Sequence, residues 1–395
     1  MTAPVRLRMT TVRANDLEFG LLEAGSGPLA LCLHGFPDTA RTWEHLLPAL
    51  AGAGFRAVAP FMRGYAPTAI PADGAYQVGA LVADAVALHE ALGGDGDAVL
   101  IGHDWGAETA YGAAAFAPDR WRRLVTLAVP PAALDAVLFS DYEQLKRLFY
   151  TFMFRDPNGF ADALVARDGM AFLDRLWADW SPGFPAGGHL ARVKESLRQP
   201  ANLAAAIGYY RAAGGYYRAL GVQDPPGDSS DGATRYAAEQ EATGRQAPQP
   251  TLYLHGADDG CIRVELARGA ERLLAPASRM VVIEHASRTG MARAQDKSLS
   301  AFISPTDGCL ENVILASAAP VAFLPLTRLA ACPDSGRGSV VASCAGAWGR
   351  QGRGDLVWAD LGWSGGPSGR SNGGREQAPI RRPGAARSSA RWAAA

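Results

Sequence analysis

Two kinds of hydrophobic pattern alternate along the first 130 residues. Short continuous apolar runs rich in β-branched residues predict buried strands, and longer stretches with apolar positions at helical spacing predict amphipathic helices. The expected strands are 29–35, 55–60, 98–102 and 123–129. A helix between the first two should begin at Asp38 and end at the Ala-Gly repeat at 51–54. Strands that alternate with helices are typical of a mostly parallel sheet with helices on both faces, so we predict an α/β fold.

The pattern changes after residue 130. Residues 131–249 are aromatic-rich and helical in spacing, with no strand-like run, and they predict an inserted helical cap. The last part of this segment is rich in turn residues and should return to the sheet as a flexible loop. Two further buried strands are expected at 250–256 and 279–285. The core is therefore predicted in two parts, 1–130 and 250–303.

Residues 304–395 form a low-complexity tail. Ala, Gly, Ser, Arg and Pro dominate it, and it has no helical or strand periodicity, so disorder is expected. The same composition results when GC-rich DNA is read out of frame. The sequence leaves open whether this tail is native or frameshifted.

Composition excludes several function classes. A net charge of −1 with no basic stripe argues against a nucleic-acid partner, and five scattered cysteines predict neither a disulfide framework nor a metal site. No signal sequence is expected at the start, and the longest apolar stretch, 313–327, is shorter than the roughly 20 residues of a membrane helix. A cytoplasmic protein that acts on a small molecule, without a membrane partner, is the expectation, and its oligomeric state is left open.

The segment "AVLIGHDWGAETA" at 98–110 carries the first candidate chemistry. A strand-like run meets a glycine on each side of Asp104 and then a helical run, which is the frame of a nucleophile elbow with aspartate in place of serine. An aspartate carboxyl is ionised at neutral pH, since its ordinary pKa is about 3.9. It can attack a saturated carbon directly and form an alkyl ester, which water then hydrolyses. Asp104 is therefore the predicted nucleophile.

Four motifs in this order resemble the α/β-hydrolase superfamily, in its epoxide hydrolase and haloalkane dehalogenase branch: "HGFPDTARTW", "RGYAPT", "GHDWGA" and "HGADDG". The resemblance covers roughly residues 12–285, and Ala66 stands where the family usually has glycine. It implies an α/β-hydrolase fold and an oxyanion hole formed by the amides of Phe36 and Trp105. It implies no metal and no cofactor.

The resemblance also indicates the acid and the base that should release the ester. In "HGADDG" the acid position matches Asp259, with Asp258 as its neighbour. The base should be a histidine after the last strand, but by strand register that position is Arg288, and arginine stays protonated up to a pKa above about 12. The alternative base is His285, three residues earlier, and no histidine follows it. The other six histidines show no pattern that separates them from turn or surface residues.

The cap distinguishes between substrates. Epoxide opening leaves an alkoxide, which a tyrosine hydroxyl can protonate. The segments "FYTFMFRDP" and "GYYRA" resemble the epoxide hydrolase segments that carry two such tyrosines, at Tyr150 and Tyr210. A dehalogenase needs N–H donors for a halide, and Phe36 stands where many of them carry a polar donor.

The sequence thus predicts a hydrolase that opens epoxides to diols through an ester on Asp104, with a small apolar electrophile and water as its partners. Two alternatives stay open. One is a haloalkane or haloacid dehalogenase that uses the same nucleophile. The other is a catalytically inactive homologue that only binds ligand, because the base is missing.

Overall fold

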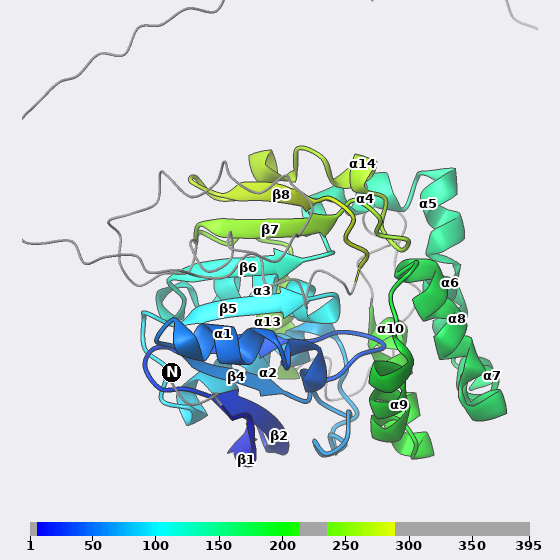
Figure 1. Cartoon of the computed structure of the whole chain (residues 1–395), viewed down its shortest axis with the longest axis horizontal. Coiled ribbons are helices and arrows are strands. Elements are labelled where there is room, and N and C mark those ends of the chain that lie inside the picture. The colour runs from blue at the N-terminus through cyan, green and yellow to red at the C-terminus, as the bar shows by residue number, and fades with distance from the viewer. Residues whose placement is uncertain (1–5, 214–234, 289–395) are drawn as a thin grey trace, which may run out of the picture. The chain divides into compact units, whose positions relative to one another are not determined.

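The computed structural model describes residues 6–213 and 235–288, and within them eight strands form one sheet (Figure 1). The spatial order is β1-β2-β4-β3-β5-β6-β7-β8. The pairs from β4 to β8 are parallel, whereas β1 and β2 pair antiparallel with each other and β2 pairs antiparallel with β4. The strands are β1 (Arg8–Ala14), β2 (Leu17–Ala24), β3 (Leu29–Leu33), β4 (Arg56–Pro60), β5 (Val99–His103), β6 (Arg123–Leu127), β7 (Thr251–Gly256) and β8 (Arg279–Ile283). The predicted fold class is confirmed.

Helices cover both faces of this sheet. Figure 1 shows α1 in front of the sheet and α2 and α3 behind it. Strands β3, β5 and β7 are buried along their whole length, because parallel strands between two helical layers have no solvent-facing side. The helices packed on the sheet are α1 (Leu46–Gly52), α2 (Val78–Ala91), α3 (Trp105–Phe116) and α14 (Val264–Ala267), and α13 (Ala237–Ala242) packs on α2 and α3. Short 3-10 turns are η1 (Ala40–Trp43), η2 (Pro118–Arg120), η3 (Ala132–Leu134), η4 (Arg167–Gly169) and η5 (Ala270–Leu273).

A run of helices lies in the chain between β6 and β7 and forms the cap, on one side of the sheet in Figure 1. None of the described residues in this run is a strand, as the sequence predicts. The helices are α4 (Asp135–Leu138), α5 (Tyr142–Arg147), α6 (Phe149–Phe154), α7 (Phe160–Ala166), α8 (Ala171–Trp180), α9 (Gly187–Ser196) and α10 (Pro200–Ala212). In the part of the chain that the structure describes, no helix combines the length and apolar character needed to cross a membrane.

Three local expectations need correction. The first helix does not begin at Asp38: Thr39 caps the short turn η1 by accepting from the Arg41 amide, and α1 follows it. The antiparallel pair of β1 and β2 was not among the predicted strands. The expected flexible return loop contains α13, which packs on α2 with the Gln240 side chain accepting from the Gly79 amide at 2.8 Å. The predictions for the tail lie outside the described residues.

Polar contacts join the cap to the loop that follows β4. The Tyr209 hydroxyl donates to the Arg63 carbonyl at 2.9 Å, and the Asn202 amide donates to the Gly64 carbonyl at 2.6 Å. The Ser196 hydroxyl donates to the Ala66 carbonyl at 2.6 Å. The segment "RGYA" of the sequence motif therefore serves as a row of backbone acceptors for cap helices α9 and α10.

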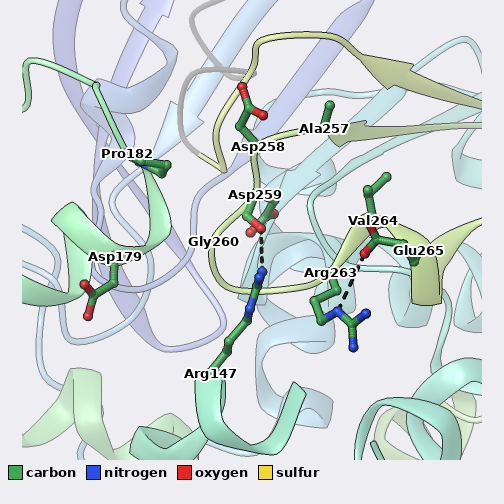
Figure 2. Close-up of a pocket in the computed structure, with 10 residues that line it drawn as sticks. All are labelled: Arg147, Asp179, Pro182, Ala257, Asp258, Asp259, Gly260, Arg263, Val264 and Glu265. Carbon is green, nitrogen blue, oxygen red and sulfur yellow. Dashed lines mark hydrogen bonds and ion pairs between the residues drawn. The ribbon is translucent and has the colours of Figure 1, made fainter. Parts of the chain in front are cut away.

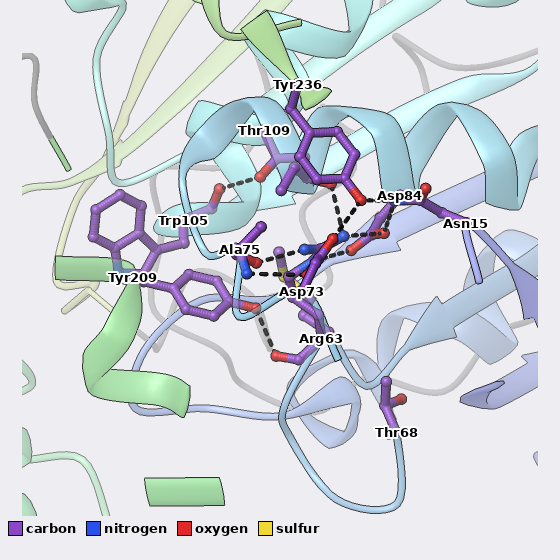
Figure 3. Close-up of polar contacts among 12 residues, drawn as sticks. Asn15, Arg63, Thr68, Asp73, Ala75, Asp84, Trp105, Thr109, Tyr209 and Tyr236 are labelled. Carbon is purple, nitrogen blue, oxygen red and sulfur yellow. Dashed lines mark hydrogen bonds and ion pairs between the residues drawn. The ribbon is translucent and has the colours of Figure 1, made fainter. Parts of the chain in front are cut away.

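The Arg63 side chain anchors this loop from the inside (Figure 3). The side chain is 1 % exposed, and its guanidinium forms two bonds of 2.6 Å with the two carboxylate oxygens of Asp84 on α2. It also donates to the carbonyls of Ala75 and Ala80, and it lies 5.5 Å from the centre of the Tyr236 ring. A buried charge persists only when it is paired and hydrogen-bonded, and Arg63 meets both conditions.

Candidate active site

The chain turns sharply at Asp104, between β5 and α3. Asp104 has φ 57° and ψ −123°, a conformation that non-glycine residues adopt rarely and at an energetic cost. The turn brings strand and helix so close that a Cβ on Gly102 would lie 2.1 Å from the Gly106 carbonyl oxygen. A Cβ on Gly106 would lie 2.2 Å from the Leu33 oxygen. The close approach of β5, α3 and β3 thus explains both glycines of the motif. The sharp turn places Asp104 at the end of β5, where α3 begins.

Substituting Gly102 by alanine should therefore destabilise the fold by about 1 to 3 kcal/mol, because backbone atoms must move to admit the methyl group. Urea unfolding measures this change. Gly52 at the end of α1 is the matched control, because a Cβ there meets nothing within 4 Å. Equal stability of G102A and G52A would contradict the close approach in the elbow.

The loop after β3 supplies a donor to Asp104. The Phe36 amide donates to Asp104 Oδ1 at 2.8 Å, and both residues are buried. Gly35 makes this contact possible, since a Cβ there would lie 2.3 Å from that same oxygen. Trp105 is the first residue of α3, and its indole N–H has no acceptor among the described residues. The structure thus places Phe36 and Trp105 beside Asp104, and the oxyanion hole from their two backbone amides stays a prediction.

The side chain at position 288 completes a buried charge cluster, which we define as Asp104, Arg288 and Asp259. Arg288 is 2 % exposed; its Nη2 lies 2.5 Å from Asp104 Oδ2 and its Nη1 lies 3.3 Å from Asp259 Oδ2. The Trp180 ring lies 5.7 Å from the guanidinium carbon. Burial opposes the charge, but the facing Cys261, Asp259 and Asp104 side chains outweigh it and raise the pKa of Arg288 well above its ordinary range. A permanent cation therefore occupies the position where strand register places the base.

The Asp259 carboxylate is hydrogen-bonded within the turn that follows β7. Its Oδ1 accepts from the amides of Cys261 and Ile262 at 2.8 and 3.0 Å, so that Oδ2 remains for Arg288. The neighbouring Asp258 is exposed, and Figure 2 shows its carboxylate turned away from Asp259. The open polar pocket in that figure does not include Asp104 in its lining, and Arg147 there donates to the Asp259 carbonyl at 3.0 Å. Of the two acidic residues, Asp259 is the one that the fold brings, through Arg288, to Asp104.

His285 is not brought into this cluster. It is exposed in the turn after β8, with φ 57°, and among the described residues no hydrogen bond or ion pair joins it to Asp104 or Asp259. The Ala286 carbonyl accepts from the Asp258 amide at 3.0 Å, so the chain runs beside the acid turn and directs residue 288 inward. The geometry gives no support to His285 as the base.

Five of the other six histidines are buried, although no sequence pattern separates them from turn or surface residues. The buried set is His34, His89, His103, His189 and His255. His255 Nε2 lies 3.8 Å from Asp259 Oδ2, but its ring nitrogens contact the Tyr253 hydroxyl and the Ile262 carbonyl. Burial lowers the pKa of His34 to about 4, so this ring is neutral at pH 7. Its two nitrogens pair with the Gly35 carbonyl and the Met62 amide.

The two cap tyrosines lie over the elbow. Tyr150 on α6 and Tyr210 on α10 are both buried, with ring centres 5.6 Å apart. The Tyr210 ring also lies 5.0 Å from that of Trp105 and 5.3 Å from that of Phe36. Burial raises the pKa of the Tyr150 hydroxyl well above its ordinary range, so it is a neutral donor. The structure thus brings these tyrosines to the residues around Asp104, whereas Tyr209 points to the Arg63 carbonyl.

Comparison with known proteins identifies the fold family. The family model described as "alpha/beta hydrolase fold" matches residues 28–291, more than half of the chain. An epoxide hydrolase of Caballeronia sordidicola is 37 % identical over 186 residues, which are 43 % of this chain and 55 % of the relative. Epoxide hydrolase A of Mycobacterium tuberculosis is 35 % identical over 42 % of this chain and 52 % of the relative. The chain thus spans about half the length of the curated relatives it matches.

Solved structures share the fold. A Bacillus megaterium epoxide hydrolase in complex with an inhibitor has a TM-score of 0.59 at 22 % identity, covering 72 % of this chain and 95 % of that one. Epoxide hydrolase A of Mycobacterium thermoresistibile has a TM-score of 0.58 at 24 % identity, covering 75 % and 97 %. Together with the sheet order, the elbow at Asp104 and the family match, these similarities show that the chain belongs to the α/β-hydrolase fold family.

Proposed function

We propose that this chain opens epoxides by attack of Asp104 and that the reaction stops at the ester. One observation supports the attack by Asp104. The Phe36 amide donates to Asp104 Oδ1, and two buried tyrosines, Tyr150 and Tyr210, lie near the same turn. The epoxide hydrolases among its relatives support the substrate class. The buried charge cluster of Asp104, Arg288 and Asp259 supports the arrest at the ester.

In the first step a lone pair of Asp104 Oδ2 forms a bond to an oxirane carbon, and the carbon–oxygen bond of the ring breaks. A carboxylate oxygen has two lone pairs, so contact with Arg288 leaves one for attack. The Phe36 amide fixes the direction of the carboxylate. The ring oxygen takes a proton from the hydroxyl of Tyr150 or Tyr210, which gives a hydroxyalkyl ester on Asp104.

In the second step water must attack the ester carbonyl and lose a proton to a base. The guanidinium of Arg288 stands at that position and cannot accept a proton. Asp259 is already bound to two amides and to Arg288, so it is not positioned to replace the base. We therefore expect the ester to accumulate while diol forms far more slowly.

The test is to incubate the protein with an aryl epoxide and to weigh the peptide that contains Asp104. The expected result is a stable mass increase of one epoxide on that peptide, with little diol, and no increase in the variant Asp104→Asn. Absence of both adduct and diol from the wild type would refute the proposed function. Rapid diol formation without a lasting adduct would refute the arrest at the ester.

A further inference from the structure

A polar contact ties the loop that carries the Phe36 amide to the cap. The Asp38 carboxylate and the His189 imidazole on α9 meet with Oδ1 and Nε2 2.7 Å apart, and their side chains are 3 % and 1 % exposed. These residues lie 151 positions apart in the sequence. Burial opposes the negative charge of Asp38, but His189, and after it His103 and His34, hold the pKa of this carboxyl below its usual range.

A neighbouring cap helix binds the preceding residue of the same loop. The Trp177 indole N–H on α8 donates to the Pro37 carbonyl at 3.1 Å, and its ring centre lies 5.1 Å from that of His189. We call these four residues, Pro37, Asp38, Trp177 and His189, the cap latch. Two consecutive residues of the loop are therefore held by two cap helices.

The cap latch acts on a very short turn. The Asp38 amide donates to the Gly35 carbonyl at 3.1 Å, and the Asp38 carboxylate accepts from the Thr39 amide at 2.7 Å. Phe36 lies inside this turn: its amide donates to Asp104, and the next two residues of the turn contact Trp177 and His189. A turn of this size transmits displacement of residues 37 and 38 to the amide of residue 36. No described hydrogen bond or ion pair joins His189 or Trp177 to Asp104 itself.

We infer that His189 is a positioning residue: through Asp38 it aims the Phe36 amide at Asp104 and so couples cap placement to nucleophilic attack. This inference rests on the proposed function for its kinetic consequence. A misplacement of about 1 Å near reacting atoms lowers rates by up to about 100-fold. The variant His189→Leu replaces the imidazole by an apolar side chain of similar bulk and so removes the nitrogen that contacts Asp38.

The kinetic test is the rate of Asp104 labelling by an aryl epoxide as its concentration is varied. We expect H189L to lower the maximal labelling rate by about 10- to 100-fold while the half-saturating concentration changes by less than about threefold. His189→Gln keeps a side-chain donor and should recover part of the rate. The matched control is Arg192→Gln, which also breaks a contact from α9 to the core, at Glu44 and away from the loop, and should label at the wild-type rate.

A second measurement keeps the inference separate from the proposed function. Hydrogen exchange of the Phe36 amide should be faster in H189L than in R192Q, whatever the reactivity of Asp104. If H189L does not fold, Trp177→Phe is used instead of H189L in both measurements. This variant removes the indole N–H that donates to the Pro37 carbonyl. Wild-type protein that takes no epoxide would refute the proposed function alone. Wild-type labelling rates in H189L, or unchanged Phe36 exchange, would overturn the role of His189.

Discussion

Replacing Arg288 by histidine should raise the rate of diol release by about 100- to 10,000-fold, the range that a positioned general base contributes. The reason is the location of residue 288, whose side chain already reaches both Asp104 and Asp259. An imidazole there can take a proton from water while Asp259 holds its other nitrogen. The measurement is diol formation from an aryl epoxide, together with decay of the adduct on Asp104.

The control for this substitution separates loss of the cation from gain of a base. Arg288→Met removes the charge and the contact with Asp104 Oδ2, but it provides no group that accepts a proton. We expect R288M to form the ester and to retain it. Equal diol release by R288M and R288H would contradict the claim that residue 288 is the position of the general base. An ester that persists in folded R288H would contradict it as well.

Replacing Arg63 by methionine should destabilise the protein by about 3 to 5 kcal/mol, because removing one member of a buried ion pair leaves the other charge unpaired. Asp84 would keep the Asn15 amide at 2.8 Å and lose both guanidinium bonds. Urea unfolding followed by circular dichroism measures the loss.

A pair with only one buried member gives the scale. Arg8 pairs with Glu23; the Arg8 side chain is 73 % exposed, and the buried Glu23 keeps Arg56 as a second partner at 3.1 Å, so loss of Arg8 leaves no unpaired charge and should cost about 0 to 1 kcal/mol. Arg8→Met should therefore change the free energy of unfolding far less than R63M. The double variant R63M/D84L should recover part of the loss, because it leaves no unpaired charge. Similar losses in R8M and R63M would contradict the role of burial.

Local pattern was sufficient to predict the centre of this site. The strand, glycine and helix pattern around Asp104 lies within a dozen residues, and the fold forms it as expected. The resemblance, together with the register of the last strand, located residue 288, which the structure places against Asp104 and Asp259. Tyr150 and Tyr210 required the resemblance, since aromatic residues at helical spacing are usually core residues.

The remaining features depend on contacts that no local pattern contains. Asp38 and His189 are distant in the chain, and Asp38 by itself reads as a helix start signal. In β1, exposed and partly buried residues alternate only weakly, so its sequence pattern hardly predicts a strand. Pairing with β2 is what makes this segment a strand. α13 follows a segment rich in turn residues, and its packing on α2 and α3 determines its conformation.

The half-buried character of β8 has a consequence for how this site changes during evolution. Asp104, Phe36 and Asp259 follow strands that are buried throughout, whereas residue 288 follows a strand whose five residues are all only partly buried. Segments outside the packed core tolerate insertions and deletions far better than core strands do. His285 lies three positions before Arg288, so an insertion of three residues between Ile283 and His285 would place an imidazole at the cluster. Loop length after β8, as well as residue identity, thus decides which side chain faces the two carboxylates.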